Sequence, residues 1–439
     1  MRTWVLLLGV LALVVTQAMR MPASARGDAS TGGMIALGAF EEEPPPASAR
    51  RSVDDLLVLA DQTREAGDLR GADALLRQAI ALDRRDPRAA TTLRAMYQTP
   101  GVSLPVDQEA VSELQARLGP TFRATQTRHF VVLSDSDPAW TRSREAMLER
   151  TYRQVFRFAD RLGMSVHVPE AKLICVLVDD YDTYRSFAGK HDAVSAHWMA
   201  GYYTATGNRV VFYNDRTGPQ FREAESVLRG YEADARRARE ESVLAHRRRD
   251  RDAVAAYAAR ADLIEEHVAS ERGRIAAAAE AMSTAKTIHE AAHLVAFNIG
   301  LQLRTHQYPF WLTEGLATNF ESETGEGAFG PDTSVEQREE ELRRAMGEGR
   351  LLPLREFVQM THVPHDSEEA AGAMYPQAYS LFQHAARYDR GALRGLFEDL
   401  NEEPGGTIAP CRLLALFERH FGDVDVYERR WLRRIEQAR

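Results

Sequence analysis

Residues 289–293 combine two histidines and a glutamate at a spacing that suits metal-dependent hydrolysis. The stretch reads His-Glu-Ala-Ala-His, so His289 and His293 are four positions apart. On an α-helix such positions share one face, and both imidazoles can bind the same metal ion. Glu290 lies beside them, where its carboxylate can reach a metal-activated water rather than the metal. The pattern therefore predicts a zinc site with Glu290 as general base.

A third protein ligand is needed, because catalytic zinc usually has three and keeps a fourth position open for water. Glu314 is the candidate, about twenty residues beyond His293 in the segment Trp-Leu-Thr-Glu-Gly-Leu-Ala. The residues around the first motif have helical periodicity, and Gly300 is the predicted stop. Pro309 opens the second segment, which has an apolar face of its own. We expect Glu314 to project from a second helix that packs against the first.

The two motifs together resemble the gluzincin clan of zinc peptidases. In that clan a His-Glu-x-x-His helix is followed by Trp-Leu-x-Glu-Gly-Leu-Ala, whose glutamate is the third zinc ligand. The resemblance implies zinc ligands at His289, His293 and Glu314, with Glu290 as base and proton shuttle. It is closest to a bacterial secreted group described as a domain of unknown function with a peptidase-like motif, and it covers roughly residues 285–380. The implied fold is α+β, with a zincin-like catalytic domain built from a small mixed sheet and the active-site helices.

The resemblance also implies a tyrosine that stabilises the oxyanion. In the aminopeptidase branch of the clan, a tyrosine at the start of a helix donates a hydrogen bond where negative charge develops. Tyr375, about sixty residues beyond Glu314, is the better match, and Tyr379 is the reserve. The chain departs from that branch after the tyrosine, where the branch has Lys-Gly. Both tyrosines could instead pack as helix aromatics, and the sequence leaves the two roles open.

Other interpretations of the metal motif have less support. Zinc could be structural, but structural sites usually have four protein ligands, often cysteine, and the chain has only Cys175 and Cys411. The motif could be inactive, yet no ligand or base is missing. Glu321 lies seven residues after Glu314. It could orient a ligand histidine, but a solvated surface glutamate is the favoured interpretation.

Composition bounds the size of the protein and its partners. At 439 residues the chain can hold two or three domains. The net charge is -9 and no basic patch of the nucleic-acid-binding kind is present, so nucleic acid is excluded as a partner. The arginine-rich runs near Arg236 and Arg247 are interpreted as solvated helix faces.

The first residues are typical of a signal peptide. Arg2 precedes an apolar run over residues 5–15, and Ala-Ser-Ala follows at residues 23–25, which predicts a signal peptide over residues 1–25. We expect a secreted or periplasmic protein, with an uncleaved membrane anchor as the alternative. Export implies an oxidising compartment, so Cys175 could pair with Cys411, although a buried free cysteine is the default.

The rest of the chain divides into segments of different composition. Residues 26–50 are rich in Gly, Ala, Ser and Pro and are predicted as a disordered linker. Residues 51–100 have the apolar spacing of one tetratricopeptide-like helix-turn-helix, which needs a neighbour to bury its face. We expect this pair to pack on its own chain rather than to dock a partner. The zincin-like metallopeptidase domain is predicted over residues 120–439.

Within that domain, strands are predicted at residues 129–133 and 173–178, with a hairpin over residues 201–213. By resemblance this hairpin is the cleft edge that binds extended peptide by strand addition, although an ordinary sheet strand is equally favoured. Residues 219–282 are rich in Ala, Arg and Glu and are predicted as an inserted helical hairpin. It could be a lid, a partner-binding arm or a spacer. The segment after Gly391 is predicted to be mostly helical.

Together these features predict an exported zinc-dependent peptidase that acts on peptide or protein substrates. No acidic motif for binding an N-terminal amine is evident before the metal helix, which favours an endopeptidase. One alternative is a non-catalytic interaction protein that binds a partner through the helical pair or the insertion. Another is a zinc amidase that acts on a non-protein amide. Membrane contact is expected only if the N-terminal segment stays uncleaved.

Overall fold

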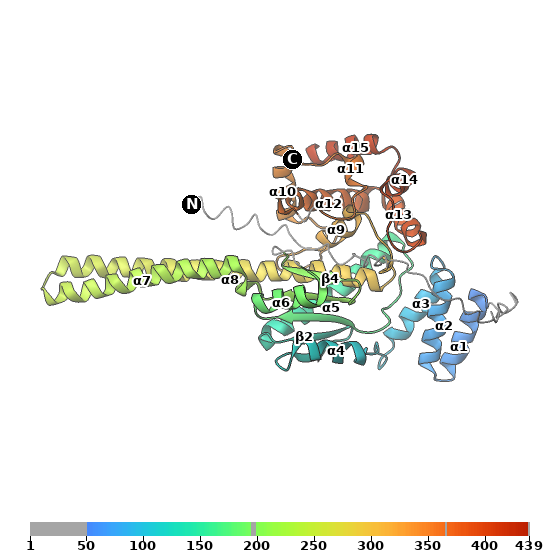
Figure 1. Ribbon diagram of the computed structural model, residues 1–439, viewed down its shortest axis with the longest axis horizontal. Coiled ribbons are helices and arrows are strands. Elements are labelled where there is room, and N and C mark those ends of the chain that lie inside the picture. The colour runs from blue at the N-terminus through green and yellow to red at the C-terminus, as the bar shows by residue number, and fades with distance from the viewer. Residues whose placement is uncertain (1–50, 195–198, 365–366, 438–439) are drawn as a thin grey trace, which may run out of the picture. The chain divides into compact units, whose positions relative to one another are not determined.

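The structure is a computed structural model that describes residues 51–194, 199–364 and 367–437, in two compact units (Figure 1). The smaller unit holds residues 51–102 and Ser165–Val168, and the larger holds Ser103–Met164 and the residues from Pro169 onward. The predicted signal peptide and linker, residues 1–50, lie outside the described residues. No helix in the described part of the chain is long and apolar enough to span a membrane.

The smaller unit contains the predicted helical pair and a third helix. These helices are α1 (Val53–Glu65), α2 (Leu69–Leu82) and α3 (Pro87–Gln98). Each begins at a side-chain cap, which satisfies backbone N–H groups that have no partner within the helix. The caps are Ser52, Asp68 and Asp86. Alanines and leucines such as Ala72, Leu76 and Leu93 are buried between the helices.

A five-stranded mixed sheet forms the centre of the larger unit, in the order β1-β2-β3-β5-β4. Its strands are β1 (Arg123–Gln126), β2 (Phe130–Ser134), β3 (Leu173–Val178), β4 (Gly201–Thr204) and β5 (Arg209–Tyr213). Strands β2, β3 and β5 are parallel, whereas β1 and β4 pair antiparallel at the two edges. The prediction of an α+β fold with a small mixed sheet is therefore confirmed. The predicted hairpin is also present, and its first strand, β4, lies at an edge.

Helices cover both faces of this sheet. Residues of α4 (Gln108–Leu118) and α6 (Tyr181–Asp192) share a hydrophobic core with alternate residues of the strands, such as Val131 and Val176. Helices α5 (Pro138–Leu162) and α8 (Arg251–Asn298) pack against strands of the same sheet. On the α8 side, the ring of Tyr203 in β4 stacks on Phe297 with 5.3 Å between centroids. The metal motif on α8 is thus held against the β4 edge.

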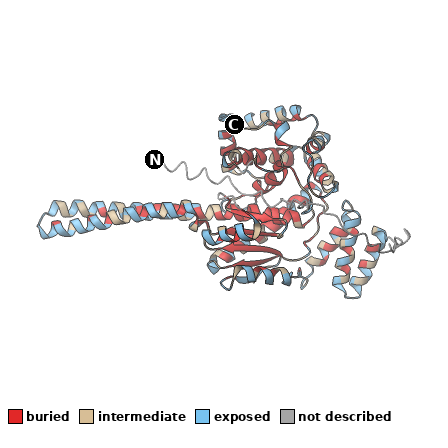
Figure 2. Ribbon diagram, in the orientation of Figure 1, coloured by how far each residue is buried: buried red, intermediate tan, exposed pale blue. Residues whose placement is uncertain are grey.

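Helix α8 is longer than the sequence predicts. It runs unbroken over 48 residues, and its first part lies antiparallel to α7 (Pro219–Arg247) as a long hairpin (Figure 1). The expected boundary between an insertion ending at residue 282 and a separate metal helix is wrong. Residues 279–287 contain neither glycine nor proline, so nothing in the backbone stops the helix. What changes there is burial, because residues 283–297 are all buried (Figure 2).

The remaining helices form the C-terminal part of the larger unit. They are α9 (Phe310–Thr318), α10 (Glu336–Gly347), α11 (Leu354–Phe357), α12 (Glu368–Tyr388), α13 (Arg390–Glu402), α14 (Pro410–Phe421) and α15 (Val424–Gln437). Helix α9 packs tightly on α12 at Gly315, where an added Cβ would lie 2.6 Å from the carbonyl oxygen of Ala378. The glycine after Glu314 therefore sets the distance between these helices. In α14, Leu413 and Leu416 are buried, whereas Leu414 is only half-buried.

The two cysteines do not pair. Cys175 is fully buried at the centre of β3, between Val132 and Val210 of the neighbouring strands. Cys411 is exposed near the start of α14. The default expectation of a buried free cysteine at position 175 is confirmed, and the alternative disulfide is not present.

Candidate metal centre

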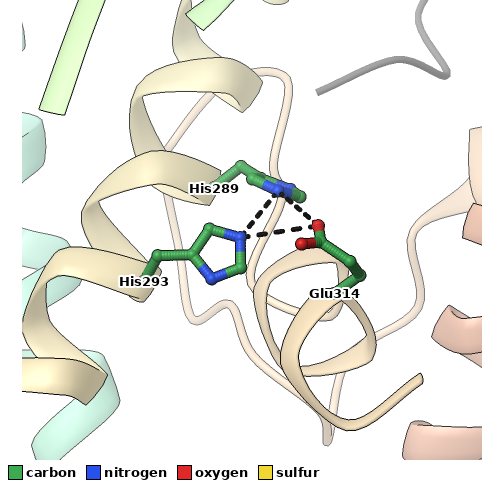
Figure 3. Close-up of side chains that lie close together, drawn as sticks. All are labelled: His289, His293 and Glu314. Carbon is green, nitrogen blue, oxygen red and sulfur yellow. Dashed lines mark hydrogen bonds and ion pairs between the residues drawn. The ribbon is translucent and has the colours of Figure 1, made fainter. Parts of the chain in front are cut away.

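Helices α8 and α9 bring His289, His293 and Glu314 together around one point (Figure 3). The Nε2 atoms of the two histidines are 3.2 Å apart. Oε2 of Glu314 lies 3.3 Å from Nε2 of His289 and 3.5 Å from Nε2 of His293. Ligand atoms about 2.1 Å from a tetrahedral zinc ion are about 3.4 Å from one another. The three groups are therefore spaced as they would be around a single metal ion, and this buried cluster can hold one.

The electrostatics of the cluster favour a cation. All three side chains are buried, and neither carboxylate oxygen of Glu314 has a hydrogen-bond partner among the described residues. A buried carboxylate without such partners is costly, and burial raises the pKa of Glu314 to about 7, although contact with His289 partly opposes this shift. Burial also lowers the pKa of His293 to about 3, which leaves its imidazole neutral and able to act as a ligand.

Glu321 fixes the orientation of His289 by contacting Nδ1, the ring nitrogen that faces away from the metal position. Nδ1 of His289 lies 2.8 Å from Oε1 of Glu321, so Nδ1 carries the proton and the lone pair of Nε2 faces the metal position. Glu321 is buried, with only 8 % of its surface exposed. The favoured interpretation of this residue as a solvated glutamate is therefore wrong, and the less favoured one, a partner of a ligand histidine, is the arrangement observed.

Arg338 holds Glu321 in that position. Its Nε and Nη2 atoms donate to the two carboxylate oxygens of Glu321, both at 2.7 Å. A third bond runs from Nη1 to Glu341 at 2.9 Å. The attraction of Arg338 and the hydrogen bonds outweigh burial, and the pKa of Glu321 is lowered. Sequence reasoning missed Arg338, because nothing in the charged repeat of α10 separates it from Arg343 or Arg344.

Glu290, next to the ligand His289 in sequence, is a buried acid at the candidate site. It is fully buried, and both of its carboxylate oxygens lack hydrogen-bond partners among the described residues. Burial raises its pKa well above the ordinary value, and the nearby charge of Glu314 raises it further. Lys286 and the backbone N–H of Tyr203 act in the opposite direction. A raised pKa is the direction of shift expected for a carboxyl group that acts as a general base.

Lys286 anchors this turn of α8 to the sheet. Its buried ammonium group donates to the carbonyl oxygen of Tyr213 at 2.9 Å and to Oδ2 of Asp215 at 2.6 Å. Ser283, one turn earlier, also donates its hydroxyl to Asp215. These contacts fix the rotation of α8 about its axis and so fix which side chains face β4.

The two candidate tyrosines have different surroundings. Tyr375 is fully buried in α12, its ring centroid lies 6.4 Å from that of His289, and the guanidinium of Arg338 lies over its ring. Tyr379 lies one turn later, and its hydroxyl accepts hydrogen bonds from the backbone of Val335 and the side chain of Gln383. Tyr375 is therefore the tyrosine beside the cluster. It lies within α12, before an internal proline at 376, and not at the start of the helix.

We expect Glu321→Gln and Arg338→Met to weaken metal binding 10- to 100-fold, in the range of about 10–100 typical for partners of ligand histidines. Glu321→Gln removes the carboxylate that lies against Nδ1 of His289, and Arg338→Met removes the two hydrogen bonds that hold this carboxylate in place. The dissociation constant for zinc, measured by competition with a chromophoric chelator, is the readout. Arg343→Met changes the same residue type on the same helix and is the matched control. Unchanged zinc affinity in both site variants would show that Glu321 has no role in orienting the ligand.

Metal-free protein is expected to be less stable at pH 8 than at pH 5. The pKa of Glu314 rises from 4.5 to about 7 on folding, so stability is full below pH 4.5 and falls as the pH rises through 7. At about 1.4 kcal/mol per unit, this group alone lowers stability by about 3 kcal/mol at high pH. Urea unfolding of chelator-treated protein at several pH values measures the loss. Glu314→Gln should make the dependence less steep, although the raised pKa of Glu290 and the lowered pKa of His293 still contribute to it. An equally steep profile in that variant would contradict the assignment.

Comparison with known proteins finds one similarity. Residues 283–404 match a family model described as a protein of unknown function (DUF1570). No curated protein and no solved structure matches the chain. The matched segment begins in α8 shortly before His289 and ends after α13, so it contains Glu290, Glu314 and Tyr375 as well. The segment of similarity is thus the segment that carries the candidate metal centre.

Proposed function

We propose that this chain is a zinc-dependent hydrolase with a zincin-like catalytic domain, and specifically an exported peptidase. The observation that supports it most is that His289, His293 and Glu314 converge at ligand spacing beside Glu290. The buried carboxyl group of Glu290 has no hydrogen-bond partner with good geometry among the described residues. Two histidines and a carboxylate are the donor set typical of catalytic zinc, which leaves one position open. Export is proposed from the signal-peptide pattern of residues 1–25.

Each residue at the site has its own role in the proposed reaction. Zinc bound there would polarise a carbonyl group and lower the pKa of water toward about 7. Glu290 accepts the proton from the attacking water and then returns it to the leaving amine. The hydroxyl of Tyr375 donates to the oxygen on which negative charge develops. Glu321 and Arg338 keep His289 in the tautomer that presents Nε2.

The β4 edge supplies a way to hold an extended substrate. Among the described residues this strand pairs only with β5, and it lies against α8, where the backbone N–H of Tyr203 is near Glu290. An extended peptide could add to its free edge through main-chain hydrogen bonds, which recognise a peptide backbone of any sequence. This mode favours cleavage within a chain over removal of terminal residues.

The test is cleavage of a mixed peptide library by the zinc-loaded chain without its predicted signal peptide, with products identified by mass spectrometry. We expect internal cleavage that 1,10-phenanthroline stops and added zinc restores. Cleavage of cell-wall fragments but not of peptides would select the amidase alternative. If the zinc-loaded protein cleaved neither, the proposal of a hydrolase would fail in favour of an interaction protein.

A further inference from the structure

The end of the α7–α8 hairpin carries a cluster of exposed arginines. We call residues 243–252 the hairpin tip; they include Arg247, Arg248, Arg249 and Arg251, all of which are exposed. Within the described part of the chain, none of these four guanidinium groups forms an ion pair. Two acids lie in the same segment: Asp250 accepts from the backbone of Ala253 as the N-cap of α8, and Asp252 lies in the first turn of α8. Four arginines and two aspartates leave the hairpin tip with a net charge of +2.

Two arginines along the body of the hairpin form ion pairs across it. Arg239 pairs with Asp262 and Glu265 across the two helices, and Arg272 pairs with Glu225 and Glu232. These pairs link α7 to α8. The arginines of the hairpin tip make no such link, so their charge is not explained by holding the two helices together.

The backbone at the turn has an uncommon conformation at Arg249. Arg249 has φ of 62°, in the left-handed region that disfavours side chains with a Cβ. The amide of Arg249 bonds to His246 and that of Asp250 to Ala245, which is the helix-ending motif in which glycine is the usual residue. Arg249 thus occupies a position where glycine would fit with less strain.

Exposed aliphatic side chains lie beside these arginines. Val243 and Leu244, in the last turns of α7, are 54 % and 37 % exposed, whereas Ala245 faces α8 and is buried. Cationic side chains next to exposed aliphatic groups suit a surface that is anionic outside and apolar just beneath.

We propose that the hairpin tip docks on an anionic lipid bilayer. The end of two helices, each about 10 Å wide, offers about 200 Å², whereas a specific protein interface needs about 800 Å² on each partner. A bilayer sets no such requirement, because anionic headgroups gather around each arginine independently. Leu244 and Val243 would enter the headgroup region, and the arginines would contact phosphate groups. This contact is independent of the metal centre.

The test is flotation of the full chain with vesicles of phosphatidylglycerol, compared with vesicles of phosphatidylcholine. The tip variant changes Arg247, Arg248 and Arg251 to serine. Its matched control changes Arg229, Arg236 and Arg260 to serine, which removes the same charge from exposed, unpaired positions on the body of the hairpin. Residues 1–50 are identical in both, so any binding through that segment cancels in the comparison.

We expect the parent and the control to bind phosphatidylglycerol vesicles and to be released by about 0.5 M salt, because screening is strong at that ionic strength. The tip variant should bind about a hundredfold more weakly, from roughly fivefold for each arginine. Equal binding by the tip variant and the control, equal binding to phosphatidylcholine, or no binding by the parent would each overturn the proposal.

One substitution, at Arg249, tests charge and backbone conformation through two separate measurements. Arg249→Gly relieves the left-handed strain and should slow amide hydrogen exchange at the hairpin tip. It should also weaken vesicle binding about fivefold. Unchanged vesicle binding with slower exchange would show that the charge of Arg249 has no part in docking.

Discussion

Glu290→Gln is expected to abolish hydrolysis while leaving zinc bound. The change keeps the shape of the side chain but removes the group that accepts a proton from water, and such groups contribute about 10²- to 10⁴-fold to rate. The variant should also be more stable than the parent, because the buried carboxyl group, which has no hydrogen-bond partner among the described residues, is replaced by a neutral amide. Loss of activity together with a gain of stability distinguishes a catalytic group from a structural one.

The measurements are zinc content by elemental analysis, turnover of the best peptide found in the library, and the midpoint of thermal unfolding. Glu266→Gln is the control, since Glu266 is an exposed glutamate on the same helix. Full activity in Glu290→Gln would rule out Glu290 as the general base, even if the zinc site were intact.

Glu314→Ala is expected to remove zinc from a protein that otherwise holds about one ion per chain. The two histidines that remain are too few for tight binding, because catalytic zinc usually has three protein ligands. Elemental analysis after dialysis against metal-free buffer gives the stoichiometry. His293→Ala should have the same effect.

A loss of zinc could also arise from a disturbed fold, because Glu314 lies next to the tight α9–α12 contact at Gly315. Glu314→Gln, which nearly preserves volume, is the control for that outcome. It should unfold at a temperature at least as high as the metal-free parent and still bind zinc poorly. Zinc bound in Glu314→Ala as tightly as in the parent would place the third ligand elsewhere.

The sequence could predict the candidate ligands because they reside in short motifs on two consecutive helices. Spacing of four residues places His289 and His293 on one face in any α-helix, whatever surrounds it. The hairpin of β4 and β5 was likewise visible as two apolar runs around a turn. Strand β1 was not, because all four of its residues are exposed and carry no apolar alternation.

Contacts between distant segments could not be read in the same way. Glu321 was ranked as a surface residue, because its burial depends on Arg338 of α10, seventeen positions later. A buried ion pair leaves no periodic signal, since both partners look like ordinary surface charges in sequence. Helix α8 was divided at residue 282 for a related reason. Near residue 282 the amino-acid composition changes because α8 passes from solvent into the core, but the helical backbone continues.

Because α8 is unbroken, the length of the hairpin depends on the number of residues in its two helices. From Arg251 to His289 the helix rises about 57 Å, at about 1.5 Å per residue. Removal of about seven residues from each of α7 and α8 would shorten the arm by about 10 Å and keep nearly the same rotational phase at its end. Lys286 and its partners Tyr213 and Asp215 would be untouched, because they lie beyond the paired part. The length of the hairpin can thus change in steps of seven residues per helix while the metal centre stays the same.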